Sequence, residues 1–449
     1  MKFYKTSSIL LTCLLSGSCL SKLVDRTTFV TDILGIDEGT FYKNETALKN
    51  ALSFSKDSSD AFLKNNPVQK IAFINTLNPN TYKPTSTSYQ AGYFEEMSLD
   101  DLRDATKEMK PGGGVFNVIE SANFPGDYID AFDIGALQAK SENVDAVFQV
   151  ASNFNGLEFA SNAGNQMHKV YEYIYDNTQG PGASISAAPG TLFRQYYVYY
   201  DKDKQPKEWM QTLKHQIEFL GNTDIPTKNG YVAFPQKNMD SVKFNPQINT
   251  GAIKIGFQGA TQVTYGLKKN GSQHEKISNP KQIINQVFTA AVDFATWSGS
   301  GNDIHNKKQV AIAKSIVQAA YEGTLRATLF KGKKKVILTL IGGGVFDNDI
   351  RWISTVLTNL KDFIKESGLD ITLSIFDASG FIKKNKTMWS EFQQSVEQLV
   401  KDTHGTYIRY SAKKTTGETI VQPKKVVINE AIKKPIEQLG SAFRNITTF

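Results

Sequence analysis

Three consecutive glycines, Gly342, Gly343 and Gly344, follow an uncharged aliphatic run at 336–341. The run is typical of a strand buried on both faces, and the glycines permit a close approach that a Cβ would prevent. Apolar residues then recur at helical spacing over 353–364. A strand, a glycine turn and a helix can present free N–H groups to an anion such as a diphosphate. A tight turn that simply needs glycine is the alternative.

A second cluster of polar residues follows another predicted strand. The stretch 144–151 is nearly all apolar, and it ends in Ser152, Asn153, Phe154 and Asn155. Short polar side chains at the carboxyl end of a buried strand lie where α/β sheets bind ligands. Asparagine can donate and accept at once, which suits a ribose or an adenine edge. The alternative is that these asparagines serve only the geometry of a turn.

Two aspartates lie between these clusters in the sequence. Asp293 interrupts an apolar segment at 286–294, and Asp303 belongs to a loop of small residues at 298–303. Both cysteines, Cys13 and Cys19, lie near the N-terminus, which excludes a cysteine nucleophile or a thiolate metal site in the body of the chain. The five histidines are scattered. We therefore expect neither a metal nor a cofactor.

The 449 residues suffice for an enlarged α/β domain with appendages. We divide them into an expected export segment at 1–20, a mainly helical region at 21–110, an α/β domain at 111–382 and a basic extension at 383–449. Ser98 is expected to cap a helix, with Asp101 at its third position. The aromatic stretch 191–200 is predicted to be a strand.

The first 20 residues combine a basic start, a short apolar run and small residues, which is typical of a secretory signal. A buried N-terminal helix is the alternative. The run is too short to span a bilayer comfortably, and no longer apolar stretch follows. We expect a mature chain without a membrane span, which is secreted or exported to the periplasm or into a host cell.

The formal net charge is +7, and the C-terminal part carries much of it. From Lys401 onward there are nine lysines and arginines against four aspartates and glutamates. Such a tail can bind phosphates or an acidic partner, but we favour the simpler interpretation, a solvated surface. Basic and aromatic residues do not alternate, so no nucleic-acid partner is predicted.

The order of these motifs resembles the macrodomain family. Asp133-Ile134, then Val144-Asp-Ala-Val147 and Ala151-Ser-Asn153, are similar to its opening elements, and Gly342–Phe346 is similar to its glycine-rich diphosphate loop. Together with Asp293, Asp303 and the segment Tyr321-Glu-Gly-Thr-Leu325, the pattern resembles most the macrodomain ADP-ribosylhydrolases of bacterial effectors related to MavL. The resemblance covers roughly 112–380, so the α/β domain at 111–382 is expected to be macrodomain-like.

This resemblance implies an enlarged macrodomain-like mixed sheet flanked by helices, which binds ADP-ribose and removes it from ADP-ribosylated protein. It implies an arginine linkage, with ubiquitin as one candidate carrier. The family's glycine-rich catalytic loop and its Gln-Glu-Glu signature are absent, which leaves Asp293 and Asp303 as the implied catalytic residues. The ligand-binding residues that it implies are Gln149, Ser152, Asn153, Asn155, Gly342, Gly343, Gly344, Val345, Phe346 and Asp347.

Hydrolysis at an anomeric carbon passes through an oxocarbenium-like state, which carboxylates can assist by activating water and by stabilising positive charge. The apolar surroundings of Asp293 are expected to raise its pKa and to suit it to an acid role. Two other interpretations remain open: a module that binds ADP-ribose without hydrolysing it, and a nucleotide-binding scaffold whose basic C-terminal segment docks a partner.

Overall fold

The computed structural model describes residues 23–55, 71–121, 133–159, 169–199, 210–268, 273–376, 383–415 and 418–426. The predicted export segment at 1–20 and the last part of the basic extension, 427–449, lie outside these residues. No helix in the described ranges combines the length and the apolar character that crossing a bilayer requires.

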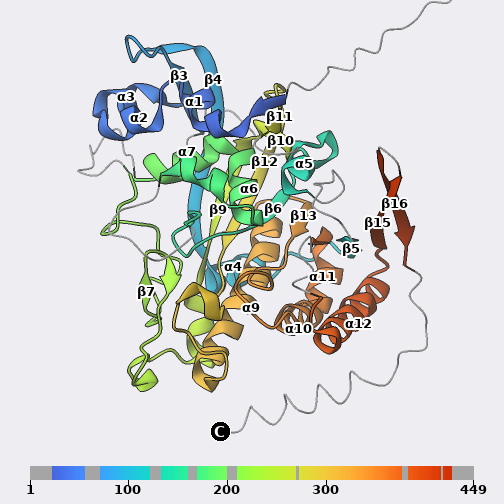
Figure 1. Ribbon diagram of the computed structural model, residues 1–449. Coiled ribbons are helices and arrows are strands. Elements are labelled where there is room, and N and C mark those ends of the chain that lie inside the picture. The colour runs from blue at the N-terminus through green and yellow to red at the C-terminus, as the bar shows by residue number, and fades with distance from the viewer. Residues whose placement is uncertain are drawn as a thin grey trace, which may run out of the picture.

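An eleven-stranded mixed sheet forms the centre of the molecule (Figure 1), in the order β16-β15-β5-β14-β13-β6-β12-β9-β4-β3-β2. Its middle is parallel and consists of β15 (Tyr407–Thr415), β5 (Val115–Ser121), β14 (Asp370–Ile375), β13 (Lys335–Leu338), β6 (Val147–Ala151) and β12 (Ile283–Thr289). Antiparallel strands complete both sides, namely β16 (Glu418–Lys425), β9 (Lys254–Gln262), β4 (Pro84–Ser98), β3 (Ala72–Leu77) and β2 (Leu52–Phe54). The predicted class, a mixed α/β sheet flanked by helices, is confirmed.

Helices cover both faces of the sheet, and neighbouring strand residues show this directly. Val147 and Val336 pack in one buried cluster, whereas Phe148 and Ile337 pack in another, as alternation along a strand requires. One face carries α4 (Leu99–Thr106), α9 (Lys307–Phe330), α10 (Arg351–Asn359), α11 (Lys361–Ser367) and α12 (Lys386–Asp402), and the other carries α5 (Ile134–Ala139), α6 (Gln179–Ser186) and α7 (Ala188–Tyr196).

The region 21–110 differs from the expectation that it is mainly helical. Helices α1 (Phe29–Leu34), α2 (Glu38–Lys43) and α3 (Glu45–Ala51) are present, but β4 is 15 residues long and pairs with β9 in the main sheet. Its first residues are exposed and polar, so the apolar alternation that marks a strand is missing there. Smaller sheets join β1 (Leu23–Asp25), β11 (Gln273–Lys276) and β10 (Tyr265–Lys268), and β7 (Thr227–Lys228) with β8 (Tyr231–Val232). A short helix, α8 (Pro246–Asn249), precedes β9.

The prediction of a strand at 191–200 is wrong, because residues 191–196 belong to the helix α7, which begins at Ala188 and ends at Tyr196, and residues 197–199 form a turn. Pro189 stands in its first turn, where a missing N–H costs nothing. The aromatic residues Phe193, Tyr196 and Tyr197 lie on one helical face. They pack in a buried cluster with residues of α1, α2 and α3, which we call the N-terminal core. Tertiary packing thus overrides the strand propensity of aromatic residues.

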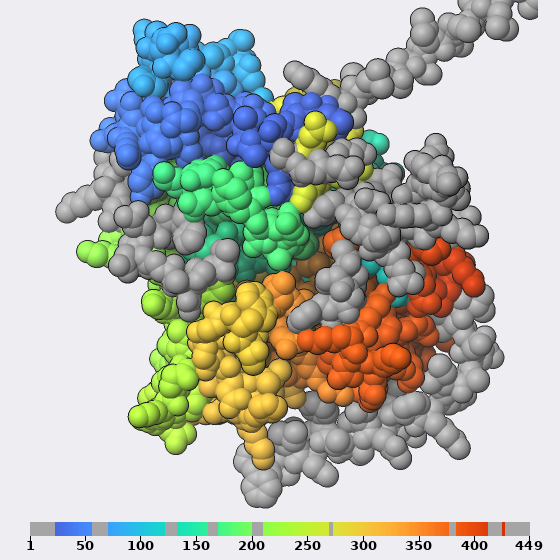
Figure 2. Space-filling view, in the orientation of Figure 1, coloured from blue at the N-terminus to red at the C-terminus, as the bar shows by residue number. Residues whose placement is uncertain are grey.

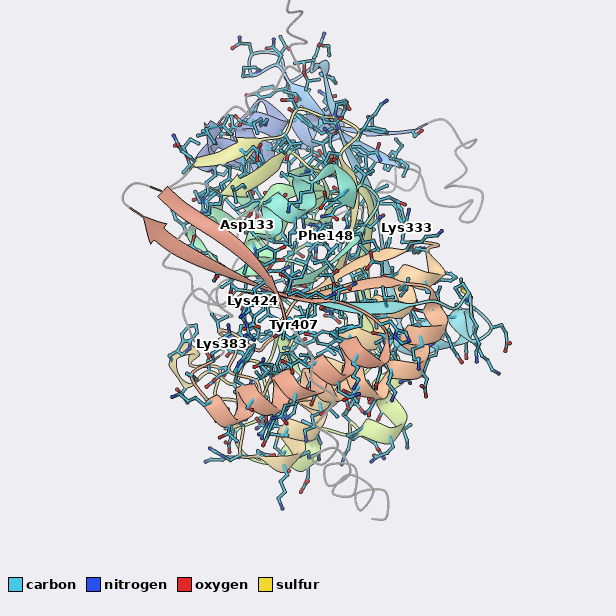
Figure 3. The ribbon with its side chains drawn as sticks, turned by 90° about the vertical axis from the view of Figure 1, so that its right-hand side faces the viewer. Asp133, Phe148, Lys333, Lys383, Tyr407 and Lys424 are labelled. Carbon is cyan, nitrogen blue, oxygen red and sulfur yellow. The ribbon has the colours of Figure 1, made fainter. Side chains whose placement is uncertain are left out.

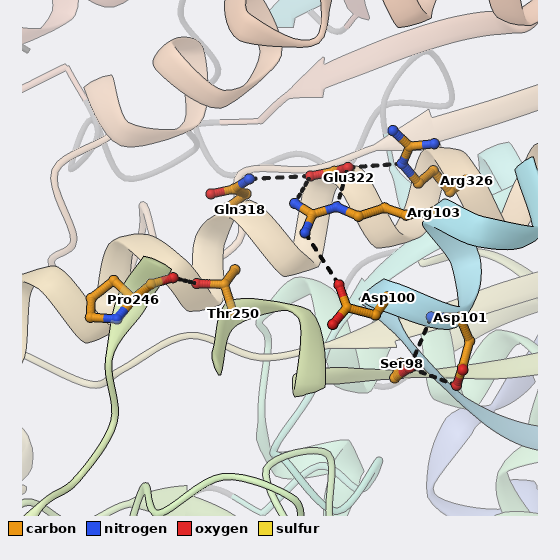
Figure 4. A network of polar contacts seen from close by, with 9 residues as sticks. All are labelled: Ser98, Asp100, Asp101, Arg103, Pro246, Thr250, Gln318, Glu322 and Arg326. Atoms are coloured by element: carbon orange, nitrogen blue, oxygen red, sulfur yellow. Dashed lines mark hydrogen bonds and ion pairs between the residues drawn. The ribbon is translucent and has the colours of Figure 1, made fainter. Parts of the chain in front are cut away.

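Helices α4 and α9 are joined through Glu322 (Figure 4). Its carboxylate accepts two bonds from the Arg103 guanidinium, at 2.9 and 2.8 Å, and one from Arg326 at 2.8 Å. At the start of α4 the Ser98 hydroxyl accepts the N–H of Asp101, so the predicted cap is confirmed. Glu322 therefore serves the packing of two helices and faces α4.

Candidate functional site

Three neighbouring parallel strands, β13, β6 and β12, bring the candidate loops to one edge of the sheet. Ala151 of β6 lies opposite Thr289 of β12, and Ile337 of β13 lies opposite Phe148. The loops that follow these strands are 152–159 (the asparagine loop), 290–303 (the aspartate loop) and 339–350 (the glycine loop). Figure 3 shows the two ends of the sheet, with Lys333 before β13 on one side and Lys383 after β14 on the other. Carboxyl ends of parallel strands are where such sheets bind ligands.

Tyr231 contacts or lies beside all three loops. Its hydroxyl donates to the carbonyl of Phe159, and its ring centroid lies 6.0 Å from that of Phe346. Burial raises its pKa, the negative charge of Asp293 acts in the same direction, and a hydrogen bond with the side chain of Asn153 lowers it. The asparagine, aspartate and glycine loops therefore converge on one buried phenol.

Sequence reasoning missed Tyr231, although a signal was present. The dipeptide Asn229-Gly230 separates β7 from β8, and both residues have positive φ, 51° and 79°. This pattern is typical of a two-residue hairpin turn. The turn also supports the asparagine loop, because Phe154 donates its N–H to the carbonyl of Gly230 at 2.7 Å.

Asp293 follows β12 and is buried, with 5 % of its surface exposed. One carboxylate oxygen accepts the N–H of Ala295 at 3.0 Å. Burial raises its pKa, although hydrogen bonds from Ser298 and Ala295 act in the opposite direction. The predicted upward shift is therefore confirmed. A carboxyl of this kind keeps its proton to a higher pH than an exposed aspartate does.

Asp303 has different surroundings. Its side chain is exposed and accepts the N–H of His305 at 2.9 Å, while its own N–H donates to the Gln309 side chain at 2.7 Å. It therefore stands in the turn just before α9. Asn302, its neighbour, donates to the carbonyl of Asp293 at 2.9 Å, so both aspartates belong to one internally bonded loop.

The three glycines of the glycine loop have different roles. Gly342 has a φ of +72°, and a Cβ there would lie 2.5 Å from that of Ala291. A Cβ on Gly343 would lie 2.7 Å from the Ile350 side chain, whereas no atom of the described residues lies within 4 Å of one on Gly344. Packing thus explains the first two glycines, and the third borders open space.

The predicted succession of strand, glycine turn and helix holds only in part. Helix α10 begins at Arg351, seven residues after Gly344, so its N-terminus does not directly follow the turn. Instead the turn uses three of its own amides, since Gly343, Asp347 and Asn348 donate to carbonyls within 340–344. The N–H groups of Gly344, Val345 and Phe346 have no acceptor in the described part of the chain. Successive free amides of this kind can bind an anion.

Asp347, next to these amides, also has a positive φ of 54°. Its carboxylate forms an ion pair of 3.2 Å with Lys384, which comes from the segment between β14 and α12. About half of each side chain is exposed, 47 % and 49 % respectively. The pair places one negative and one positive charge beside the free amides.

Several predicted ligand residues are engaged with the protein itself. Gln149 is fully buried, donates to the carbonyl of Ala320 at 3.1 Å and accepts the N–H of Thr339 at 3.3 Å. Asn155 is also fully buried; its side-chain amide donates to Gln216, and its side-chain oxygen accepts the N–H of Leu157. The hydroxyl of Ser152 donates to the carbonyl of Asn153 at 2.9 Å, and the side-chain amide of Asn153 donates to Phe159 at 3.3 Å. These side chains hold the loops in place.

Within the described ranges, no three histidine, cysteine, aspartate or glutamate side chains gather as metal ligands would. The fold and the site therefore define a mixed α/β protein whose candidate site combines main-chain amides, asparagine and one buried carboxyl at the carboxyl edge of its sheet.

Comparisons with known proteins agree with this fold only in outline. No protein-family model and no curated protein sequence match the chain. A poly(ADP-ribose) glycohydrolase from Deinococcus radiodurans in complex with ADP-ribose is similar in structure, with 11% identity, a TM-score of 0.37, and coverage of 68% of this chain and 95% of that one. For the enzyme from Thermomonospora curvata the values are 10% identity, a TM-score of 0.37, and coverage of 67% and 85%. We assign no residue and no substrate from this likeness.

Proposed function

We propose that this protein binds ADP-ribose at the carboxyl edge of its sheet and removes it from ADP-ribosylated protein. The observation that carries the proposal is the convergence at Tyr231 of the asparagine loop, the aspartate loop and the glycine loop. The glycine loop offers free main-chain amides and the aspartate loop a buried carboxyl, while the side chains of the asparagine loop hold the loops in place. The order of the motifs in the sequence supports the same ligand.

The diphosphate is proposed to bind at the glycine loop. The N–H groups of Gly344, Val345 and Phe346 can donate to phosphate oxygens, which accept strongly because they are charged. The missing Cβ of Gly344 leaves room for the phosphate to approach the main chain. The ribose that bears the scissile bond would then lie toward the aspartate loop.

In the proposed reaction the bond between the anomeric carbon of ribose and its carrier breaks, and the oxygen of a water molecule bonds to that carbon. Asp293 is the proton donor to the leaving group, because its raised pKa keeps it protonated to a higher pH. Asp303 takes the proton released by the attacking water. The negative charge of the two aspartate carboxylates stabilises the oxocarbenium-like state between these events.

One observation favours a second candidate function, a module that binds ADP-ribose without hydrolysing it. The Asp303 side chain is exposed and already accepts an N–H from His305, so it can serve as an ordinary helix-start residue. In that case the site would bind ADP-ribose and release no product. The nature of the carrier is a further part of our proposal: the motif pattern favours an arginine linkage, ubiquitin is the first carrier to test, and the N-terminal sequence favours action after export.

Calorimetry with ADP-ribose and an assay of its release from modified protein test this proposal together. The wild type is expected to bind and to release ADP-ribose, while Asp293→Asn and Asp303→Asn bind it but release it far more slowly. Asp240→Asn is the matched control, since the Asp240 side chain is 96 % exposed. Binding without release by the wild type would establish the second candidate, and no binding at all would refute both.

A further inference from the structure

We propose that Trp297 contacts the protein that carries ADP-ribose, beside the bond that is hydrolysed. The inference deepens the proposed function and rests on it. Trp297 lies in a 3-10 turn, Thr296–Ser298, within the aspartate loop, and 69 % of its surface is exposed. Within the described residues its ring has no hydrogen-bond, aromatic or cation partner. Exposing the large apolar ring of tryptophan to water is unfavourable in free energy, and tryptophan is enriched among residues that dominate binding at protein interfaces.

The loop presents this tryptophan on a fixed support. The Ser300 hydroxyl donates to the carbonyl of Asp293 at 2.8 Å, and Asn302 donates to the same oxygen at 2.9 Å. Gln236 donates to the carbonyl of Gly301 at 2.8 Å from outside the loop. Gly299 and Gly301 adopt φ values of 70° and 72°, which a side chain would strain. Because folding has already ordered the loop, binding through Trp297 loses little further entropy.

The position of the loop favours the carrier protein over the nucleotide as the occupant. The glycine loop follows β13 and the aspartate loop follows β12, and β6 lies between these strands. Two strand spacings separate β13 from β12, roughly 10 Å. With the diphosphate at the glycine loop and the scissile bond at Asp293, the chain beyond Asp293 lies on the side of the leaving group.

The chemistry of the loop agrees with this position. Residues 294–302 carry no charged side chain, so the loop is suited to an apolar protein contact and not to phosphate. Val345 of the glycine loop, 45 % exposed, adds a second apolar side chain at the same sheet edge. Figure 2 shows the gold segment around residue 300 uncovered on the face toward the viewer.

Trp297→Ala is the test, with Tyr175→Ala as the matched control, because Tyr175 is a 76 % exposed aromatic residue on a different element, the 3-10 helix Val170–Tyr175. Three quantities are measured: kcat/KM for release from an ADP-ribosylated protein, hydrolysis of ADP-ribosyl-arginine as a small substrate, and the affinity for free ADP-ribose. We expect kcat/KM on the protein to fall about tenfold, the loss typical of a truncated interface tryptophan, with the other two unchanged. Trp297→Phe should restore part of the loss.

The outcomes separate the alternatives. If Trp297→Ala weakens free ADP-ribose binding, the ring stacks on the nucleotide and the inference is wrong. If release from the protein substrate is unchanged, the inference is also wrong, while the proposed function stands. If the wild type binds no ADP-ribose, the proposed function fails and the inference fails with it. An unchanged melting temperature of Trp297→Ala will show that the fold is intact, as its exposure requires.

Discussion

The hydroxyl of Tyr321 anchors the start of the glycine loop, and its removal is the sharpest test of how that loop is held. Tyr321 lies on α9 and is fully buried. Its O–H donates to the carbonyl of Thr339 at 2.5 Å and accepts the N–H of Ile341 at 3.0 Å. Tyr321→Phe keeps the ring and removes both bonds at once.

The expected loss of stability follows from these two bonds. A buried hydrogen bond contributes about 0.5–1.5 kcal/mol net, and a buried group left without a partner costs about 1–3 kcal/mol. Ile341 is buried and loses its acceptor, whereas Thr339 is half-buried and can bind water in place of the phenol. We therefore expect Tyr321→Phe to lower the free energy of unfolding by about 2–3 kcal/mol, measured as a shift of the urea midpoint at unchanged m.

The same change should weaken ADP-ribose binding about five- to tenfold, because the amides of Gly344, Val345 and Phe346 follow directly from the released segment. Tyr197→Phe is the control: this buried hydroxyl donates to the carbonyl of Leu48 at 2.9 Å, in the N-terminal core. With one bond removed where Tyr321→Phe removes two, it should cost about 1–2 kcal/mol and leave the affinity unchanged. Equal affinity of Tyr321→Phe and wild type would refute the role in the loop, and a stability change below about 0.5 kcal/mol would refute the hydrogen-bond account.

Three further predictions concern charge. Burial raises the pKa of Asp293, so the folded state binds more protons at this site than the unfolded state does. The site therefore lowers the stability of the wild type as pH rises above the usual aspartate range. In urea unfolding, Asp293→Asn should show a stability that depends less on pH between acid and neutral conditions. Despite burial, bonds from Arg103 lower the pKa of Glu322; Glu322→Gln should cost about 2 kcal/mol at neutral pH, and the difference from wild type should shrink as acid protonates Glu322. Asp347→Asn should tighten ADP-ribose binding and Lys384→Gln should weaken it, each about two- to fivefold and less at high salt. Binding of adenosine, which lacks the diphosphate, should change in neither variant. Equal effects on both ligands would contradict the placement of the diphosphate at the glycine loop.

The parts of the fold that could be predicted are those whose signal is local. The nearly all-apolar runs at 144–151 and 336–341 marked β6 and β13, because strands buried on both faces have no polar side to alternate with. Both strands are shorter than these runs, since β6 begins at Val147 and β13 ends at Leu338. Strand β4 gave no such signal, since its exposed first half is polar and its place in the sheet comes from pairing with β3 and with the distant strand β9. The aromatic face of α7 was misread for a related reason, because its partners lie in the N-terminal core.

The candidate site likewise has a part that local sequence could mark and a part that depends on distant partners. Polar residues at the end of β6 could mark the edge of the sheet, but only distant partners decide which polar atoms remain for a ligand. Gln149 finds its partners 171 and 190 residues away, at Ala320 and Thr339, and no local pattern contains that information. The groups left over are the main-chain amides of 344–346 and the carboxyl of Asp293. A diphosphate site built from amides depends on the course of the backbone more than on side chains. Val345→Ala should therefore keep the affinity for ADP-ribose, while Gly344→Val, which adds bulk where the phosphate would approach, should abolish it; equal affinity of both variants in calorimetry would show that the anion binds elsewhere.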